Sequence, residues 1–114
     1  MDAQTTIENF WRTQDHGDYT RLVELFADDA ILVDPFFGTF EGKQAIRGFM
    51  TRMVDEMGER KTRFRVLEIA GAGEVAWAQW VAETPRGEVN GCGLYRVRNG
   101  KLTYYRDYMN PAGR

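Results

Sequence analysis

Two aspartates set in apolar sequence are the residues of this chain that could do acid–base chemistry. Asp34 follows the apolar residues 31–33 and precedes Pro35 and two phenylalanines. An apolar setting disfavours a charged carboxylate, which makes it a better proton acceptor near neutral pH. The alternative is that Asp34 followed by Pro35 begins a turn at the end of a strand. Both interpretations of Asp34 stay open at this point.

Asp107 is the second candidate. If residues 101–110 form a strand, Tyr105, Asp107 and Met109 share one face because side chains alternate along a strand. A charge flanked by apolar neighbours on its own face needs a partner or a function. A structural ion pair with Arg47 or Arg52 is the alternative to a catalytic role.

Other reactive chemistry has little support in the sequence. The chain has one cysteine and one histidine, and no metal-ligand spacing, phosphate-binding glycine loop or nucleophile elbow. Cys92 is expected to be a small buried residue, because no histidine lies near it in a catalytic pattern. We therefore expect no metal and no cofactor.

Composition excludes several classes of partner. The net charge is −2, the calculated isoelectric point is near 5.4, and the basic residues are scattered. This pattern predicts neither a nucleic-acid surface nor binding to anionic membranes. No segment is long and apolar enough for a membrane span, and no export signal is visible, so we expect a cytoplasmic protein.

Helical periodicity dominates the first half of the chain. Apolar residues at helical spacing predict helices over about 3–15, 18–26 and 43–57, the last ending at Gly58. A short strand at 31–33 is expected between them, bounded by turns at 27–30 and 38–42.

Strand periodicity dominates the second half. Four strands are predicted over about 62–70, 74–84, 88–98 and 101–110. Asn99-Gly100 is the strongest hairpin signal, because both residues tolerate positive φ. Consecutive hairpins make an antiparallel meander, so residues 1–114 are expected to form a single α+β domain.

The predicted strand 74–84 is apolar on both faces, which indicates that both faces are covered. We place its odd positions, including Trp77 and Gln79, toward the helices and its even positions outward. The outer face is then expected to join two copies in a homodimer, because its exposed aromatic residues would form a large apolar patch. The predicted interface residues are Trp80, Leu94, Tyr104 and Tyr108.

Aromatic residues make up 13% of the chain, with seven Phe, five Tyr and three Trp. This exceeds what a small core needs, and favours a pocket for a hydrophobic small molecule. The predicted substrate-binding residues are Phe10, Phe49, Met53, Trp77, Gln79, Tyr95 and Tyr105.

Six segments spread over nearly the whole chain carry a resemblance to a known family: DHGD at 15–18, LFADDA at 25–30, VDP at 33–35, GKQAIRGF at 42–49, YRVRNGK at 95–101 and YRDY at 105–108. In these segments the chain resembles bacterial ketosteroid isomerases and SnoaL-like polyketide cyclases, of the nuclear-transport-factor-two-like superfamily. The resemblance implies a cone-shaped, cystatin-like fold, in which three N-terminal helices close over a curved, mostly antiparallel sheet and enclose a pocket.

Residue by residue, the resemblance is partial. Asp34 matches the general base of the isomerases, whereas their two oxyanion-hole donors fall at Phe10 and Gly93. Asp107 matches an aspartate with acid–base roles in the limonene-epoxide-hydrolase-like members. The other polar partners of those hydrolases fall near Leu32, Asp34, Gln79 and Val81, so their relay is incomplete here.

The sequence and the resemblance together favour an acid–base enzyme of the isomerase, cyclase or lyase type. Its substrate would be hydrophobic and would bear a carbonyl or epoxide. Asp34 would be the base, while Asp107, with Gln79 as hydrogen-bond partner, would orient the substrate or return the proton. The alternatives are a non-catalytic ligand-binding or dimerisation module, and an epoxide-hydrolase-like activity centred on Asp107.

Overall fold

Three helices and six strands make up the part of the chain that the computed structural model describes, which is residues 2–15, 19–60 and 62–109. The helices are α1 (Ala3–Asp15), α2 (Tyr19–Glu24) and α3 (Lys43–Arg60). The strands are β1 (Phe26–Asp34), β2 (Gly38–Glu41), β3 (Arg63–Ala72), β4 (Val75–Thr84), β5 (Gly87–Arg98) and β6 (Lys101–Met109).

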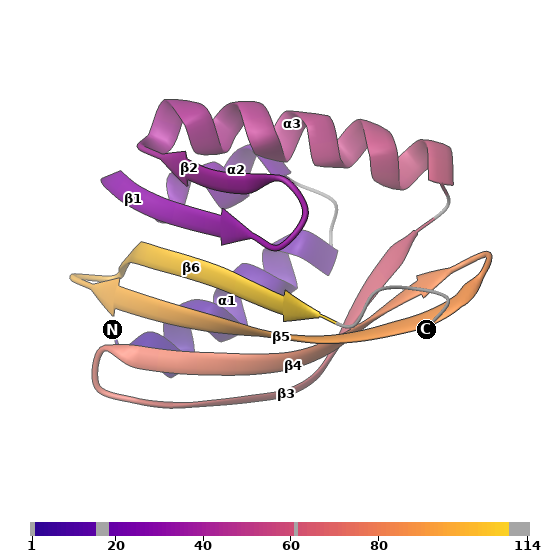
Figure 1. Cartoon of the computed structure of the whole chain (residues 1–114). Coiled ribbons are helices and arrows are strands. Elements are labelled where there is room, and N and C mark those ends of the chain that lie inside the picture. Colours follow the sequence, from indigo (N-terminus) through magenta and orange to yellow (C-terminus); the bar gives the residue numbers. More distant parts are fainter. Residues whose placement is uncertain (1, 16–18, 61, 110–114) are drawn as a thin grey trace.

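The strands form one curved, open sheet in the order β2-β1-β6-β5-β4-β3 (Figure 1). β3 to β6 form the predicted antiparallel meander. The hairpin at Asn99-Gly100 is confirmed, since both residues have positive φ, 54° and 75°. The sheet is mixed rather than purely antiparallel, because β1 pairs with β6 in parallel. The α+β class with helices on a curved sheet is confirmed.

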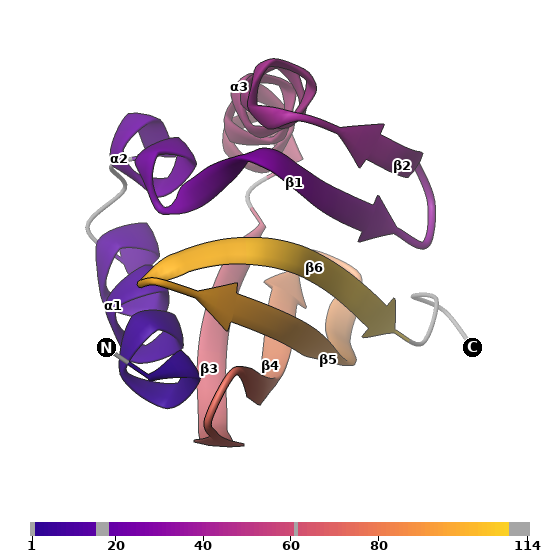
Figure 2. The ribbon, with the colours of Figure 1, turned by 90° about the vertical axis from the view of Figure 1, so that its left-hand side faces the viewer.

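The helices cover one face of the sheet (Figure 2). α1 packs against β3, β4 and β5, α3 packs against β1 and β2, and α2 lies between α1 and α3. Ile7 and Phe10 of α1, Ile46 of α3, and Leu32 and Leu102 of the sheet are fully buried in the core between these layers.

The boundaries differ from prediction around α2 and α3. α2 ends at Glu24, and residues 26–30 belong to β1 where a helix end and a turn were expected, whereas the strand predicted at 31–33 is confirmed as part of β1. The reason is non-local: the Leu102 amide donates to the Leu25 carbonyl at 2.8 Å, and β6 draws this segment into the sheet. Residues 38–41 are likewise a strand, and α3 continues past Gly58. Asp18, where the second helix was expected to begin, lies outside the described residues.

The predicted orientation of β4 is wrong by one residue. Trp80 is 2% exposed on the helix-covered face, whereas Trp77 is 39% exposed, and Gln79 is also exposed on the outer face. Ala76 and Ala78 share the inner face with Trp80, and their small side chains leave room for α1. A shift of one residue exchanges the two faces of a strand, so Trp77 and Gln79 move out of the predicted pocket and Trp80 leaves the predicted interface.

Candidate active site

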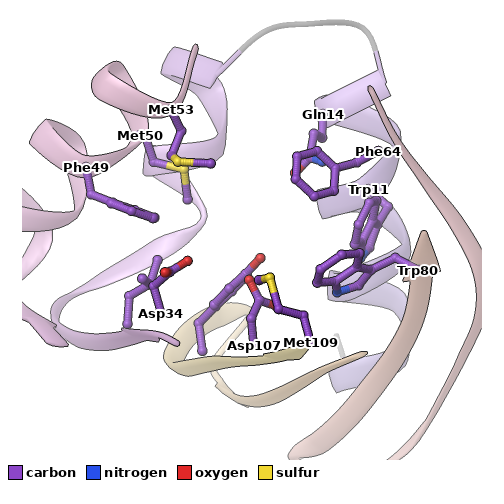
Figure 3. A pocket seen from close by; sticks show the side chains of 12 residues that line it. Trp11, Gln14, Asp34, Phe49, Met50, Met53, Phe64, Trp80, Asp107 and Met109 are labelled. Carbon is purple, nitrogen blue, oxygen red and sulfur yellow. The ribbon is translucent and has the colours of Figure 1, made fainter. Parts of the chain in front are cut away.

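A hollow lies between α1, α3 and the inner face of the sheet. Its volume is about 70 Å³, so the hollow is narrow. The side chains around it are Trp11, Gln14, Leu32, Asp34, Phe49, Met50, Met53, Phe64, Trp80, Tyr105, Asp107 and Met109. Figure 3 shows Phe49, Met50 and Met53 of α3 on one side, and Trp11, Phe64 and Trp80 on the other. Between them, at the sheet, lie two carboxylates.

Asp34 is the last residue of β1 and faces inward, following the alternation of Ala30 and Leu32. It is 7% exposed. Its Oδ1 accepts hydrogen bonds from the backbone amides of Phe36, at 2.8 Å, and Phe37, at 3.0 Å. The turn interpretation of Asp34 is therefore confirmed. The same carboxylate also lines the hollow, so the turn fixes the position of a pocket group.

The parallel pairing of β1 with β6 explains why the two carboxylates meet. Leu32 pairs with Tyr105, and Val33 pairs with Arg106. One residue further along each strand come Asp34 and Asp107, which therefore lie on the same face at the same end of neighbouring strands. Both side chains point toward the hollow in Figure 3.

Asp107 has an unusual electrostatic setting. Burial, with a further contribution from the negative charge of Asp34, raises the pKa of Asp107 to about 7. The Tyr105 hydroxyl and the Trp80 indole are directed at this carboxyl and oppose the shift, but they are the weaker effects. Near neutral pH the hollow therefore holds a mixture of neutral and charged Asp107.

The ion-pair interpretation of Asp107 is wrong. Arg47 instead lies near Glu24, with 3.8 Å between Nη2 and Oε1, and Arg52 is exposed. Within residues 2–15, 19–60 and 62–109, the enclosed Oδ1 of Asp107 has no hydrogen-bond partner. This carboxyl oxygen therefore keeps an unused hydrogen-bonding capacity.

The predicted binding residues divide into three groups. Phe49, Met53 and Tyr105 line the hollow. Phe10 and Tyr95 are fully buried behind its wall, with their ring centroids 6.5 Å apart. Trp77 and Gln79 lie on the outer face, so Gln79 does not support Asp107.

Gly93, where the resemblance expects an oxyanion-hole donor, lies opposite Asp107 across β5 and β6. A Cβ at Gly93 would overlap the hydroxyl end of Tyr95, so the tyrosine ring fills that position. The missing donor side chain is thus replaced by packing around Tyr95.

Several lining residues were missed from sequence. Trp80 was assigned to the wrong face, and Phe64 and Gln14 carried no distinguishing signal. Met50 precedes Met53 by almost one helical turn, and Trp11 follows Phe10 in the apolar part of α1; helical spacing could have placed both beside the hollow.

No group of three or more potential metal ligands occurs among the described residues. In the same residues, none of the helices is long and apolar enough to cross a membrane.

Comparison with known proteins decides the family. A model of the SnoaL-like domain matches residues 7–105. The chain belongs to the SnoaL-like family. The fold agrees, because solved structures of nuclear-transport-factor-two-like proteins superpose on this SnoaL-like domain over most of both chains. No curated protein matches it by sequence.

Three solved structures illustrate the likeness. A proposed ketosteroid isomerase from Kribbella flavida has a TM-score of 0.82 at 13% identity, covering 97% of this SnoaL-like domain and 79% of that chain. The epoxide hydrolase/cyclase-like enzyme SalBIII, of salinomycin pyran-ring formation, has a TM-score of 0.75 at 18% identity. The match covers 93% of this SnoaL-like domain and 88% of that chain. A proposed polyketide cyclase from Sinorhizobium meliloti has a TM-score of 0.77 at 18% identity. The match covers 91% of this SnoaL-like domain and 94% of that chain. At these identities the likeness shows the fold, which isomerases and cyclases share.

Proposed function

We propose that this SnoaL-like domain is an acid–base enzyme of the isomerase, cyclase or lyase type. It acts on a small hydrophobic molecule and moves a proton at a carbon next to a carbonyl group. The observation that carries this proposal is the pairing of Asp34 and Asp107 in one narrow hollow, with the pKa of Asp107 raised to about 7. A carboxyl group whose pKa is raised by burial is suited to act as an acid, and a second carboxylate beside it can act as the base.

Asp34 is the base in this mechanism. It takes a proton from the carbon beside the carbonyl, and the electrons of the broken C–H bond move to the carbonyl oxygen, forming an enolate. Neutral Asp107 donates a hydrogen bond or its proton to that oxygen. Return of the proton to another carbon completes an isomerisation, whereas attack of the enolate carbon on a second carbonyl completes a cyclisation.

The turn around Asp34 supports this assignment. Its Oδ1 is engaged by two backbone amides, which hold the carboxylate in place. Oδ2 accepts no hydrogen bond from the residues that the structure describes. A base held by one oxygen and free at the other is preorganised for proton abstraction.

The dimensions and walls of the hollow limit the substrate. Phe49, Met50 and Met53 supply apolar walls, and methionine side chains adapt to the shape of a ligand. A hollow this narrow suits a molecule of one or two rings better than a four-ring steroid.

Epoxide opening is the second candidate function, and the raised pKa of Asp107 favours it. A neutral Asp107 can protonate an epoxide oxygen while Asp34 accepts a proton from the attacking water. Formation of a diol from styrene oxide, lost in Asp107→Asn, would select this candidate over enolisation.

The proposed function is tested with 5-nitrobenzisoxazole, which a base opens by removing the C–H proton as the N–O bond breaks. Asp34→Asn should lower kcat/KM at least about 100-fold, the usual contribution of a positioned base. Asp29→Asn is the matched control, because Asp29 is an exposed carboxylate on the same strand. Wild-type turnover no faster than that of free acetate would favour the binding module instead.

The pH dependence of turnover tests the two roles. An acid acts in its protonated form, so kcat should fall as the pH rises through about 7 and Asp107 loses its proton. This decline should be absent in Asp107→Asn. A rise of kcat through the same range would mean that Asp107, rather than Asp34, is the base.

A further inference from the structure

Trp80 carries a buried hydrogen-bond donor that has no acceptor in the described part of the chain. Its side chain is 2% exposed and lines the hollow. Its indole Nε1 has no hydrogen-bond partner among the residues that the structure describes. A buried N–H group without an acceptor weakens folding, so native structures pair nearly all such groups with protein, water or ligand.

A second unpaired polar atom faces this donor. The Trp80 indole is directed at the Asp107 carboxyl, since it favours the charged form of that group. The two are nevertheless not within hydrogen-bonding geometry, because Trp80 Nε1 and Asp107 Oδ1 both lack a partner among the described residues. When Asp107 carries its proton, both groups donate. Two donors beside one hollow are suited to bind a single acceptor atom from both sides.

Packing fixes the position of the indole. A Cβ at Gly91 would overlap the Trp80 ring at Cε2, the carbon bonded to Nε1, and at the two ring carbons beyond it. Phe64 packs edge-on against the other side, with ring centroids 5.3 Å apart and an interplanar angle of 74°. Figure 3 shows Phe64 and Trp80 together on one wall, with Trp80 beside Asp107. The donor is therefore held in place before any ligand arrives.

The charges around the hollow restrict the acceptor. Two aspartates line the hollow, and no lysine, arginine or histidine is among the described residues that line it. A phosphate or carboxylate ligand would meet two carboxyl groups without a compensating cation from these residues. A neutral carbonyl oxygen avoids this repulsion and still accepts hydrogen bonds from both donors.

We propose that Trp80 is a ligand-binding residue, whose indole N–H together with Asp107 holds the carbonyl oxygen of a neutral ketone, ester or lactone. The inference rests on the proposed function for its catalytic meaning: Trp80 would stabilise the enolate oxygen while Asp34 holds the proton. This pair of donors would supply the hydrogen bonds to the substrate oxygen that the side chains at Phe10 and Gly93 cannot donate.

Binding is tested with acetophenone and α-methylstyrene, which have similar shapes but differ in having C=O or C=CH2. The three tryptophans give three indole N–H signals in a ¹⁵N–¹H spectrum, and Trp11→Phe, Trp77→Phe and Trp80→Phe assign them. Acetophenone should move the Trp80 signal downfield, and α-methylstyrene should move it much less. The exposed Trp77 is the internal control, and its signal should not move with either compound.

Affinity provides a second measurement. Trp80→Phe keeps a ring but removes the N–H, so acetophenone should bind about tenfold more weakly, the effect of one lost hydrogen bond. Affinity for α-methylstyrene should change less than about twofold. If Trp80→Phe does not fold, the spectra of the wild-type protein with the two compounds still test whether the Trp80 indole binds the carbonyl oxygen.

The inference is overturned if both compounds move the Trp80 signal equally, or if neither binds, because a bridging water alone would then satisfy the two donors. Its failure differs from that of the proposed function. Movement of the Trp80 signal without deuterium exchange at the acetophenone methyl group, and without benzisoxazole turnover, refutes the enzyme but keeps the oxygen site. Turnover with an unmoved Trp80 signal refutes the oxygen site alone.

Discussion

At the scale of single residues, Asp34 uses its two carboxylate oxygens differently. Oδ1 accepts hydrogen bonds from two backbone amides and so stabilises the turn after β1, while the side chain as a whole faces the hollow. The structural and functional interpretations of Asp34 are therefore compatible. The local sequence could not decide between them, because an aspartate before proline has the same neighbours whether or not a second carboxylate lies beside it.

Substitutions at Asp34 should separate these two roles. Asn keeps an oxygen acceptor at Oδ1, so Asp34→Asn should change the free energy of unfolding by less than about 0.5 kcal/mol. Asp34→Ala removes the acceptor and should cost about 1–2 kcal/mol, as the loss of a capping residue does. Both variants should lose turnover of 5-nitrobenzisoxazole. Urea unfolding measures the difference, and equal destabilisation by Asn and Ala would show that the turn depends on the charge.

At the scale of elements, the pocket wall depends on how β4 and β5 fit together. Trp80 pairs with Gly91, and the absence of a side chain at Gly91 leaves space for the indole. Cross-strand contacts of this kind hold the Trp80 indole in position.

Gly91→Ala should therefore displace Trp80 and destabilise the protein by about 1–3 kcal/mol, the usual effect of overpacking. Gly48→Ala is the matched control: Gly48 lies in α3 with nothing within 4 Å of an added Cβ. That change should stabilise the helix by about 0.5–1 kcal/mol. Thermal unfolding and the position of the Trp80 indole signal measure both effects. A neutral Gly91→Ala would show that the indole is not held by this contact.

The elements also show what sequence can predict. The meander and its Asn99-Gly100 hairpin were predictable, because strand alternation and turn chemistry are local. The facing of β4 was not, since Trp77 and Trp80 give both faces an aromatic residue. The full length of β1 could not be predicted from the sequence either, because its first half depends on pairing with the distant β6.

At the scale of the whole molecule, none of the described helices covers the outer face of the sheet. Trp77 is 39% and Tyr108 is 46% exposed there, and Arg106 lies over the Tyr108 ring at 5.1 Å from its centroid. Strand pairing places Leu94 and Tyr104 on the same face. We propose that this face joins two copies of the chain in a homodimer, with Trp77 in the position first assigned to Trp80.

Trp77→Arg should therefore dissociate the dimer at micromolar concentration without changing benzisoxazole turnover per chain, because Trp77 does not line the hollow. Phe36→Arg is the control, since Phe36 is an exposed aromatic residue in the turn after β1. Sedimentation velocity measures the mass. A wild-type monomer of 13.2 kDa would exclude the interface.

We infer that Asp34 and Asp107 form one electrostatically coupled pair in a shared site. The most direct measurement is an NMR titration of the aspartate side-chain carboxyl carbons. Wild-type protein should show one carboxyl with a pKa of about 7, absent in Asp107→Asn. In Asp34→Asn the loss of a neighbouring negative charge should lower the pKa of Asp107. An Asp107 that titrates near 4, the ordinary value for aspartate, or one unaffected by Asp34→Asn, would contradict the account.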